Sequence, residues 1–431
     1  MQNTSKTAWI ITTSMGYGHQ RTAYNLRFLA ETGKIINADN YDGMPESDKK
    51  IWNTTSKSYE FISSFKKVPL IGSLAFYIMD QFQKILDFYP KRDLSKPTVQ
   101  LKQTYALIKK GWGKDLIEKL KQNPVPILST FFTTAFMAEY FEYPGEIFCI
   151  ICDSDISRAW APLDPKTSKI KYLASTSRVA ERLKLYGIKE ENIFLTGYPL
   201  PLENIGSENE EILKEDLKNR LLNLDPNKAY FKNYESLIKE RLGDLPEKSD
   251  HKLILTFAVG GAGAQKEIAS YILKGLQKEI RGKEIKIILI AGTKEKVKKY
   301  FEDIIKKIGK DENFKESVEI VFEADKTDYL RRFNEVIRKT DILWTKPSEL
   351  SFYAALGLPI IIAPTIGSQE KFNRRWLLKS GFGLSQENPS YVNQWLFDWI
   401  NKGYLAEAAM QGFIEGEHFG ATNIQKIILQ N

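Results

Sequence analysis

The sequence predicts an α/β protein in which buried parallel strands alternate with helices. Residues 341–345 and 358–363 are apolar throughout, which is typical of strands that are covered on both faces. Lys346-Pro347 ends the first of these strands, and the helix that follows ends at Gly357. This pattern places the loops after the two strands side by side at their carboxyl ends, where ligands of open α/β sheets bind.

Two further observations extend the pattern to the rest of the chain. A length of 431 residues is too great for one ordinary hydrophobic core, so two domains are expected. Residues 7–12, 146–152 and 252–259 are strand-like, and each is followed by a polar or glycine-containing loop. A hydrophobic content of 42% and a charged content of 27% are typical of an ordered globular protein.

The chain carries an excess of positive charge. Its net charge is +8 and its isoelectric point is near 9.0, which favours an anionic partner such as a nucleotide diphosphate, an anionic lipid surface or nucleic acid. The alternative is a basic surface that is only solvated. Because the basic residues are scattered and form no stripe, we expect no nucleic-acid partner.

The cysteine and histidine content argues against a protein metal site. Three histidines and two cysteines are too few to build one convincingly, so no metal is expected. Cys149 and Cys152 lie in one apolar segment and would face opposite ways in a strand, so we interpret both as core residues of a reduced cytoplasmic protein. The sequence shows no basic apolar leader and no apolar run long enough to span a bilayer.

Glycines in two strand-to-helix loops are candidates for phosphate or substrate contacts. One loop has the pattern Gly16-x-Gly18-His19, and the other, residues 260–265, reads GGAGAQ. Glycine lets backbone amides approach a phosphate closely at the start of a helix. The alternatives are a tight turn at 260–265 and a purely structural helix-start role for His19.

A pair of carboxylates, Asp153 and Asp155, follows the strand at 146–152. A carboxylate at the carboxyl end of a parallel strand is well placed to act as a general base. Such a residue can equally cap a helix, so this role stays open at this point.

The segment 51–112 is helical in pattern and unusual in content. Aromatic and aliphatic side chains crowd residues 57–91, with lysines interleaved among them. This composition indicates helices that lie in a membrane interface. The alternative is that they pack on the sheet and dimerise or close an acceptor pocket.

These motifs together resemble the monogalactosyl- and diglucosyl-diacylglycerol synthases and the related lipid-linked N-acetylglucosaminyltransferase of peptidoglycan synthesis. The resemblance covers most of the chain and is strongest at 147–201 and 252–383. Its motifs are Gly16-x-Gly18-His19, Cys152-Asp153 with Trp160-x-Pro162, the glycine-rich loop at 260–265, the Lys346-Pro347 turn and Gln369-Glu370-x-x-Asn373.

The resemblance implies the GT-B fold, an α/β architecture with two Rossmann-like domains facing a cleft. The implied N-terminal acceptor-binding domain spans 1–200 and carries a membrane-associating helical insertion at about 50–115. The nucleotide-sugar-binding domain would span 201–395, and helices at 396–431 would pack back on the N-terminal domain.

The resemblance also implies an inverting, UDP-sugar-dependent hexosyltransferase with a lipid acceptor, peripheral on the cytoplasmic face of the cell membrane. No cofactor is implied beyond the UDP-sugar co-substrate. Asp153 is the first candidate, and His19 the second, for the base that deprotonates the acceptor hydroxyl. The implied donor-binding residues are Gly260, Gly261, Gly263, Lys346, Ser348, Glu349, Gln369, Glu370 and Asn373. The implied acceptor-binding residues are Gly16, Gly18, Asp155 and Trp160.

Departures from the family pattern leave alternatives open. Ala354 stands where the family has a glutamate for the ribose hydroxyls, and Glu349 stands where the family has a glycine. Residues 157–159 lack the histidine that the family has there. The alternatives are a GT-B enzyme with a soluble acceptor, a UDP-sugar epimerase, and a degenerate, non-catalytic nucleotide-sugar binder.

Overall fold

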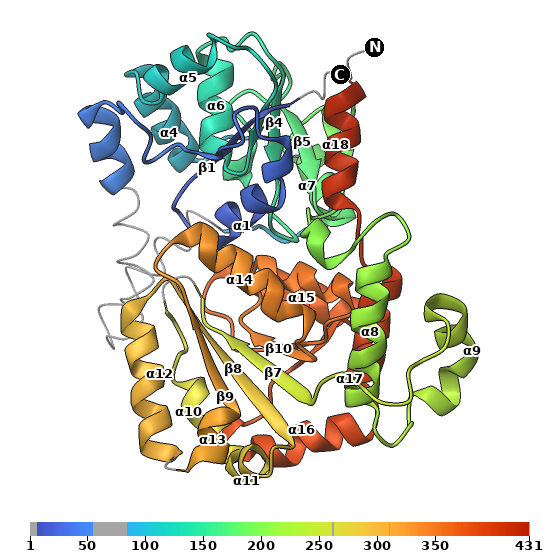
Figure 1. Cartoon of the computed structure of the whole chain (residues 1–431). Helices are drawn as coiled ribbons and strands as arrows, with labels where there is room; N and C mark the ends of the chain where they lie inside the picture. The colour runs from blue at the N-terminus through green and yellow to red at the C-terminus, as the bar shows by residue number, and fades with distance from the viewer. Residues whose placement is uncertain (1–6, 55–83, 261–262, 310, 431) are drawn as a thin grey trace. The chain divides into compact units, whose positions relative to one another are not determined.

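The computed structural model describes residues 7–54, 84–260, 263–309 and 311–430, which form two compact units (Figure 1). Unit 1 comprises the described residues of Met1–Leu200, Gly367–Asn373 and Phe419–Asn431, and unit 2 those of Pro201–Ile366 and Arg374–His418. The C-terminal chain is divided between the units, because the residues up to His418 belong to unit 2 and those from Phe419 onward to unit 1.

The described residues of unit 1 form a six-stranded parallel sheet in the order β2-β1-β3-β4-β5-β6. Its strands are β1 (Trp9–Thr12), β2 (Ile36–Asn37), β3 (Ile127–Ser129), β4 (Ile147–Ile150), β5 (Lys171–Ala174) and β6 (Ile193–Leu195). Strands β3 and β4 are buried at every position, as expected for central strands covered on both faces. The strand order reverses at β1, which has β2 on one side and β3 on the other.

The helices of unit 1 follow the strands in the expected alternation. Helix α1 begins at Tyr17, directly after the Gly16 loop, and a 3-10 turn continues it. The bounds are α1 (Tyr17–Asn25), η1 (Arg27–Leu29), α4 (Val99–Lys109), α5 (Lys114–Leu120), α6 (Phe132–Tyr140), η2 (Arg158–Trp160), α7 (Ser177–Leu185), η3 (Glu190–Asn192) and α18 (Gly420–Gln430).

The sheet of unit 2 is parallel as well, and its described strands run in the order β12-β11-β10-β7-β8-β9. They are β7 (Leu253–Ala258), β8 (Ile285–Gly292), β9 (Val318–Phe322), β10 (Ile342–Thr345), β11 (Ile360–Ile362) and β12 (Gly383–Ser385). The order reverses between β7 and β10, the arrangement of a doubly wound Rossmann-like sheet. Helices α10 and α12 cover one face of the sheet, and α8 and α17 lie on the other (Figure 1).

The remaining helices complete unit 2. Helix α15 (Ser368–Ser380) begins in the segment that belongs to unit 1 and ends in unit 2. The others are η4 (Leu202–Asn204), α8 (Glu211–Leu224), α9 (Phe231–Leu242), α10 (Ile268–Gly275), α11 (Gln277–Arg281), α12 (Glu295–Ile308), α13 (Glu312–Glu316), α14 (Lys326–Arg338), η5 (Glu349–Leu356), η6 (Pro389–Tyr391), α16 (Val392–Asn401) and α17 (Tyr404–Glu415).

The connection from β10 to β11 has the limits predicted from the sequence, but it is a 3-10 helix. Ser348 is its N-cap residue and makes no side-chain cap hydrogen bond. Gly357 ends it in the left-handed region, at φ +63°, where a glycine avoids the strain of a Cβ atom. A Cβ there would also lie 2.8 Å from the Leu217 side chain, so the turn is packed tightly on α8.

Helix α8 is rich in charged residues, but one face of it is buried. Leu213, Leu217 and Leu221 are buried, and Arg220 is 2% exposed. The Arg220 guanidinium donates to the carbonyl oxygens of Thr340, Leu356 and Gly357 at 2.7–3.0 Å. Helix α8 therefore belongs to the core of unit 2 and anchors the β10–β11 connection.

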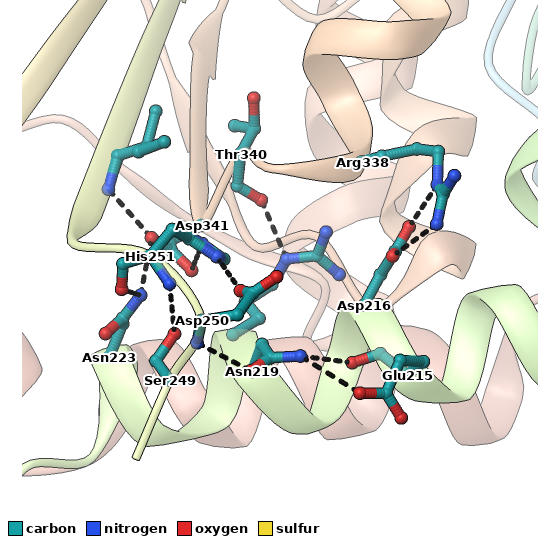
Figure 2. Close-up of polar contacts among 12 residues, drawn as sticks. Glu215, Asp216, Asn219, Asn223, Ser249, Asp250, His251, Arg338, Thr340 and Asp341 are labelled. Carbon is teal, nitrogen blue, oxygen red and sulfur yellow. Dashed lines mark hydrogen bonds and ion pairs between the residues drawn. The ribbon is translucent and has the colours of Figure 1, made fainter.

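A polar network lies at the amino end of β7 and β10, the edge opposite the loops that follow these strands (Figure 2). The buried Asp341 carboxylate accepts from Ile254 N at 2.7 Å, from Asn223 Nδ2 at 3.1 Å and from His251 Nε2 at 3.2 Å. The other ring nitrogen of His251 is hydrogen-bonded to Asp250. Because this network is at the amino edge, it stabilises the sheet and is not part of the candidate site.

The His251 contacts predict a pH-dependent stability. Burial alone would lower the pKa of His251, but the Asp341 and Asp250 carboxylates outweigh it and raise the pKa above its ordinary value of 6.5. The stabilisation from charged His251 is complete below that value and is lost as pH rises through the raised pKa. We expect the unfolding free energy to fall as the pH rises above about 6.5 and through the raised pKa, by at most about 1.4 kcal/mol per pH unit.

Urea unfolding followed by circular dichroism across this range checks the prediction. The slope should disappear in His251→Gln and persist in His418→Gln, a second histidine of unit 2. A slope unchanged in His251→Gln would contradict the assignment.

Two sequence expectations fall partly outside the described residues. Residues 55–83, most of the segment predicted to contact a membrane, and Gly261 of the predicted donor loop are not described. Within the ranges that are described, no helix has the length and apolar character needed to cross a membrane.

Candidate active site

Each sheet has a topological switch point, and the predicted functional residues gather beside both. In unit 1 the switch lies between the carboxyl ends of β1 and β3, and in unit 2 between those of β7 and β10. Diverging loops at such a point leave a crevice in which ligands of open α/β sheets bind.

His19 lies at the switch point of unit 1. Its Nδ1 is 2.7 Å from the carbonyl oxygen of Thr130, which follows β3. A carbonyl oxygen only accepts, so Nδ1 carries the proton and donates it. In the neutral ring Nε2 is then the nitrogen with the lone pair, as a general base requires. Cys152 Sγ lies 3.3 Å from the same Nδ1, so this buried cysteine helps to hold the ring and is more than core filling.

Two aromatic rings lie beside the His19 ring. The Phe131 ring meets it edge-on at 5.0 Å, and the predicted Trp160 lies 6.1 Å away. Phe132 contacts both Phe131, at 4.5 Å, and Trp160, at 5.2 Å. Trp160 is 3% exposed, whereas Phe131 and Phe132 are half-buried. The sequence analysis did not single out the two phenylalanines, although they directly follow a buried strand.

The two glycines of the first loop are placed differently. Gly16 precedes the first residue of α1, and a Cβ atom there would meet nothing within 4 Å. Gly18 lies in the first turn, where its carbonyl oxygen accepts from Thr22 Oγ1 at 2.8 Å. The open space at Gly16 leaves room for a ligand group, while Gly18 has an internal structural contact.

Asp153, the first candidate for the base, is half-buried just beyond β4. Asn373 Nδ2 donates to its Oδ1 at 3.2 Å, and Asn373 Oδ1 accepts from the backbone N and the Oγ of Ser154 at 2.9 and 2.6 Å. Ser175 Oγ donates to the Asp153 carbonyl oxygen at 2.6 Å. These bonds fix the turn after β4 and orient the carboxylate, so Asn373 of the predicted donor motif lies beside the candidate base within unit 1.

Asp155 is held in a buried ion pair. Its Oδ1 accepts a hydrogen bond from Arg182 Nε and its Oδ2 accepts one from Arg182 Nη2, each at 2.8 Å. The side chains are 4% and 0% exposed. Burial alone would lower the pKa of Arg182, but the hydrogen bonds and charge of Asp155 outweigh it and raise the pKa. This buried, bidentate pair ties the loop after β4 to α7.

Breaking this pair is expected to destabilise unit 1. Asp155→Ala leaves the Arg182 charge buried without its partner, which typically costs about 3–5 kcal/mol of unfolding free energy. Urea unfolding measures the loss. Glu181→Ala, which removes an exposed ion pair with Lys91 from the same helix, is the matched control and should change stability much less. Equal effects of the two changes would contradict a special role for the buried pair.

Arg158 occupies the segment in which the resembling family has a histidine. It is 5% exposed and donates four hydrogen bonds at 2.6–2.9 Å, two to the carbonyl oxygen of Ser95 and one each to those of Ala161 and Pro162. Burial lowers its pKa below the ordinary range. Its side chain thus fixes the loop after β4 to the segment around Ser95, which gives Arg158 a structural role.

The switch point of unit 2 brings Gly260 and Lys346 together. A Cβ atom at Gly260 would lie 2.4 Å from Lys346 Cε and 3.3 Å from its Nζ, so the lysine side chain runs directly against the glycine backbone. Thr345 Oγ1 donates to the Ala258 carbonyl oxygen at 3.1 Å and joins the two strand ends. An ammonium group thus lies beside the first glycine of this segment, and an ammonium group beside glycine amides holds phosphate in many nucleotide sites.

The described residues that follow in this segment, Gly263 and Gln265, make close contacts. Gly263 N donates to the Gly260 carbonyl oxygen at 2.7 Å, and Gly263 has φ +71°, which favours glycine. A Cβ at Gly263 would lie 2.8 Å from Val297 of α12. Gln265 Nε2 donates to the Pro364 carbonyl oxygen at 2.6 Å, which joins this loop to the one after β11. The loops after β7, β10 and β11 therefore converge.

Glu349 and Ala354, the two positions near Lys346 that differ from the family pattern, have different environments. Glu349 is the first residue of the 3-10 helix and is 9% exposed, and the preceding Ser348 is half-buried. Ala354 is 0% exposed, and its carbonyl oxygen would lie 2.2 Å from a Cβ at Gly412 of α17. Because Ala354 packs in the core beneath α17, a ligand-binding carboxylate could not be accommodated there without repacking.

Gln369 and Glu370 were predicted to bind the donor together with Lys346. The structure places both in the first turns of α15, where they are half-buried, and assigns them to unit 1. The residues that unit 2 itself brings together are Gly260, Gly263, Lys346, Ser348 and Glu349.

One family model matches part of the chain. It is a domain of unknown function (DUF6938), and it matches residues 228–374, which lie mostly in unit 2. No curated protein matches the sequence significantly.

Solved structures share the architecture over nearly the whole chain. A putative UDP-N-acetylglucosamine 2-epimerase from Listeria monocytogenes matches with a TM-score of 0.50 and 12% identity, covering 97% of this chain and 94% of that one. The fold is GT-B. UDP-GlcNAc 2-epimerase from Neisseria meningitidis bound to UDP-GlcNAc and MurG from Acinetobacter baumannii match at 11% identity, with TM-scores of 0.48 and 0.47. Each match covers 99% of this chain and 100% of the other chain.

Proposed function

We propose that the chain is a UDP-sugar-dependent glycosyltransferase whose donor binds to unit 2 and whose acceptor binds to unit 1. The single observation that supports a donor site in unit 2 is the contact of Lys346 with the Gly260 backbone at the β7/β10 switch point. Backbone amides and one ammonium group in this position suit a diphosphate and stabilise it as a leaving group without a metal. UDP is the nucleotide that the sequence resemblance implies.

The acceptor half of the proposal rests on Asp153 and His19. Both lie at the carboxyl edge of the unit 1 sheet, beyond the neighbouring strands β4 and β1–β3. Asp153 is oriented by Asn373, and the His19 tautomer presents a basic Nε2. We propose that Asp153 takes the proton from the acceptor hydroxyl in a single inverting displacement, with His19 as the second candidate.

We propose a lipid-borne acceptor at the cytoplasmic face of the cell membrane. Support comes from described residues that follow residues 55–83 in the sequence: Leu86, Tyr89 and Val99 are 40%, 67% and 64% exposed, and Lys84 is exposed as well. Apolar and aromatic side chains with interleaved lysines suit an anionic lipid surface.

Charge reversal tests the membrane part directly. Lys84→Glu is expected to weaken binding to anionic vesicles several-fold, since each lysine near such a surface contributes about 1 kcal/mol. Vesicle sedimentation with phosphatidylglycerol, against phosphatidylcholine, measures it. Lys252→Glu in unit 2 is the matched control. Binding that is insensitive to Lys84→Glu, or absent from wild type, would contradict the membrane proposal.

Turnover of radiolabelled UDP-sugars, followed by product analysis, tests the reaction class. Transfer to added lipid extracts supports the proposal. Conversion to the epimeric UDP-sugar would instead identify an epimerase, which is the class of enzyme named for the Listeria structure of the same fold. UDP binding without turnover of any UDP-sugar would identify a non-catalytic binder.

A further inference from the structure

We propose that Gln265 is a positioning residue of the donor site in unit 2. Its side chain joins the segment that follows β7 to the loop that follows β11, on either side of the strand end that carries Lys346. This inference rests on the proposed function, because it assigns a further residue to the same diphosphate site.

The hydrogen bond of Gln265 crosses the carboxyl edge of the sheet. Its Nε2 donates to the carbonyl oxygen of Pro364, which lies just after β11, at 2.6 Å. In the sheet β10 lies between β7 and β11. Because neighbouring strands are about 4.8 Å apart, the bond joins segments whose strands are about 10 Å apart, across the end of β10.

Lys346 leaves the sheet between the two joined segments. The three strand ends are linked there, because Thr345 Oγ1 donates to the Ala258 carbonyl oxygen at 3.1 Å and Ala363 N donates to the Thr345 carbonyl oxygen at 2.9 Å. Lys346 is the next residue, and its side chain runs against Gly260. The Gln265 bond therefore limits how far the segments on both sides of the lysine can part around a bound diphosphate.

The backbone of Gln265 indicates that its side chain is needed at this position. Its φ is +64°, a left-handed conformation that is unfavourable for a residue with a Cβ atom and easy for glycine. Among the described residues, five that are not glycine have a positive φ, and only Gln265 lies in a connection that follows a strand. Strained residues persist where surrounding contacts require them, and they cluster at functional sites. The unfavourable backbone is retained together with a side-chain bond that glycine could not make.

A second glutamine of unit 2 provides a comparison for a purely structural bond. Gln277 Nε2 donates to the Ile308 carbonyl oxygen at 2.9 Å. Gln277 begins α11, which leads into the amino end of β8, so this bond lies at the edge of the sheet opposite Lys346. Gln277→Ala is therefore the matched control, because it removes the same kind of bond from the same unit.

Two replacements of Gln265 separate the side-chain bond from the backbone strain. Gln265→Ala and Gln265→Gly both remove the amide, so we expect each to weaken UDP binding about three- to tenfold. Only Gln265→Gly also relieves the left-handed backbone, so its thermal midpoint should exceed that of Gln265→Ala by about 2–4 °C. Gln277→Ala should leave UDP binding unchanged. Isothermal titration of the full chain with UDP and thermal unfolding of the same samples measure both quantities.

The outcomes distinguish this inference from the proposed function. If the wild type binds UDP and both Gln265 variants bind it as tightly, the inference alone is overturned. A loss of UDP binding that follows the loss of stability, larger in Gln265→Ala than in Gln265→Gly or equally present in Gln277→Ala, would show a merely structural bond and also overturn it. No UDP binding by the wild type would contradict the proposed function and, with it, this inference.

Discussion

Lys346→Ala is expected to weaken UDP binding by about 10- to 100-fold, because it removes a charge-assisted contact with the diphosphate. Gly260→Ala should have a comparable effect for a different reason. The added Cβ would lie 2.4 Å from Lys346 Cε, so the lysine side chain must leave its place. Gly260 does not have a positive φ, so the backbone itself tolerates alanine.

Isothermal titration of each variant with UDP measures the loss. Lys252→Ala is the control for net charge, since this exposed lysine precedes β7 at the opposite edge of the same sheet. If Lys346→Ala and Lys252→Ala bound UDP as tightly as wild type, the phosphate site would have to lie elsewhere. Circular dichroism establishes that Gly260→Ala retains its fold.

Asp153→Asn is expected to lower the rate of sugar transfer by about 10²- to 10⁴-fold and to leave UDP binding unchanged, because a general base acts in the transition state and not on the donor. The amide keeps the size of the side chain and can still contact Asn373. His19→Gln should have the smaller effect if Asp153 is the base, and the larger effect if the roles are reversed.

Transfer assays at saturating UDP-sugar, with UDP titrations alongside, measure both quantities. Asp164→Asn is the matched control, because Asp164 is an exposed aspartate in the same unit. Wild-type transfer by both Asp153→Asn and His19→Gln would contradict the proposed base. A parallel loss of UDP binding would instead indicate a structural defect.

Much of the fold could be predicted because its signals are local. Apolar runs such as β7 and β10 are buried at every position, and the glycine that ends the β10–β11 connection has the left-handed conformation that its place requires. The loops that follow the strands could also be located from the sequence, and a parallel sheet gathers such loops at one edge.

The details of the site depend on contacts between residues far apart in the sequence. The sequence pattern does not distinguish Asp153 from Asp155. Only the bidentate hydrogen bonds from Arg182 show that Asp155 is the one held in a buried ion pair. Asn373 reaches Asp153 from 220 residues further along the chain. The sequence pattern contains no signal for either contact.

The environment of Ala354 likewise depends on residues far away in the sequence. Its alignment with a ligand-binding glutamate raised doubt about the donor site, but its burial against Gly412 makes it a core position. Packing of α17 on the β10–β11 connection is a long-range feature that no local pattern reports. The donor site must therefore be judged on Lys346 and the glycine loop.

Isothermal titration of the full chain with UDP, GDP and ADP tests the central claim most directly. The proposal predicts saturable binding of UDP, weaker binding of GDP and ADP, and loss of UDP binding in Lys346→Ala. Binding of none of the three nucleotides would contradict a nucleotide-sugar site in unit 2 and, with it, the proposed glycosyltransferase.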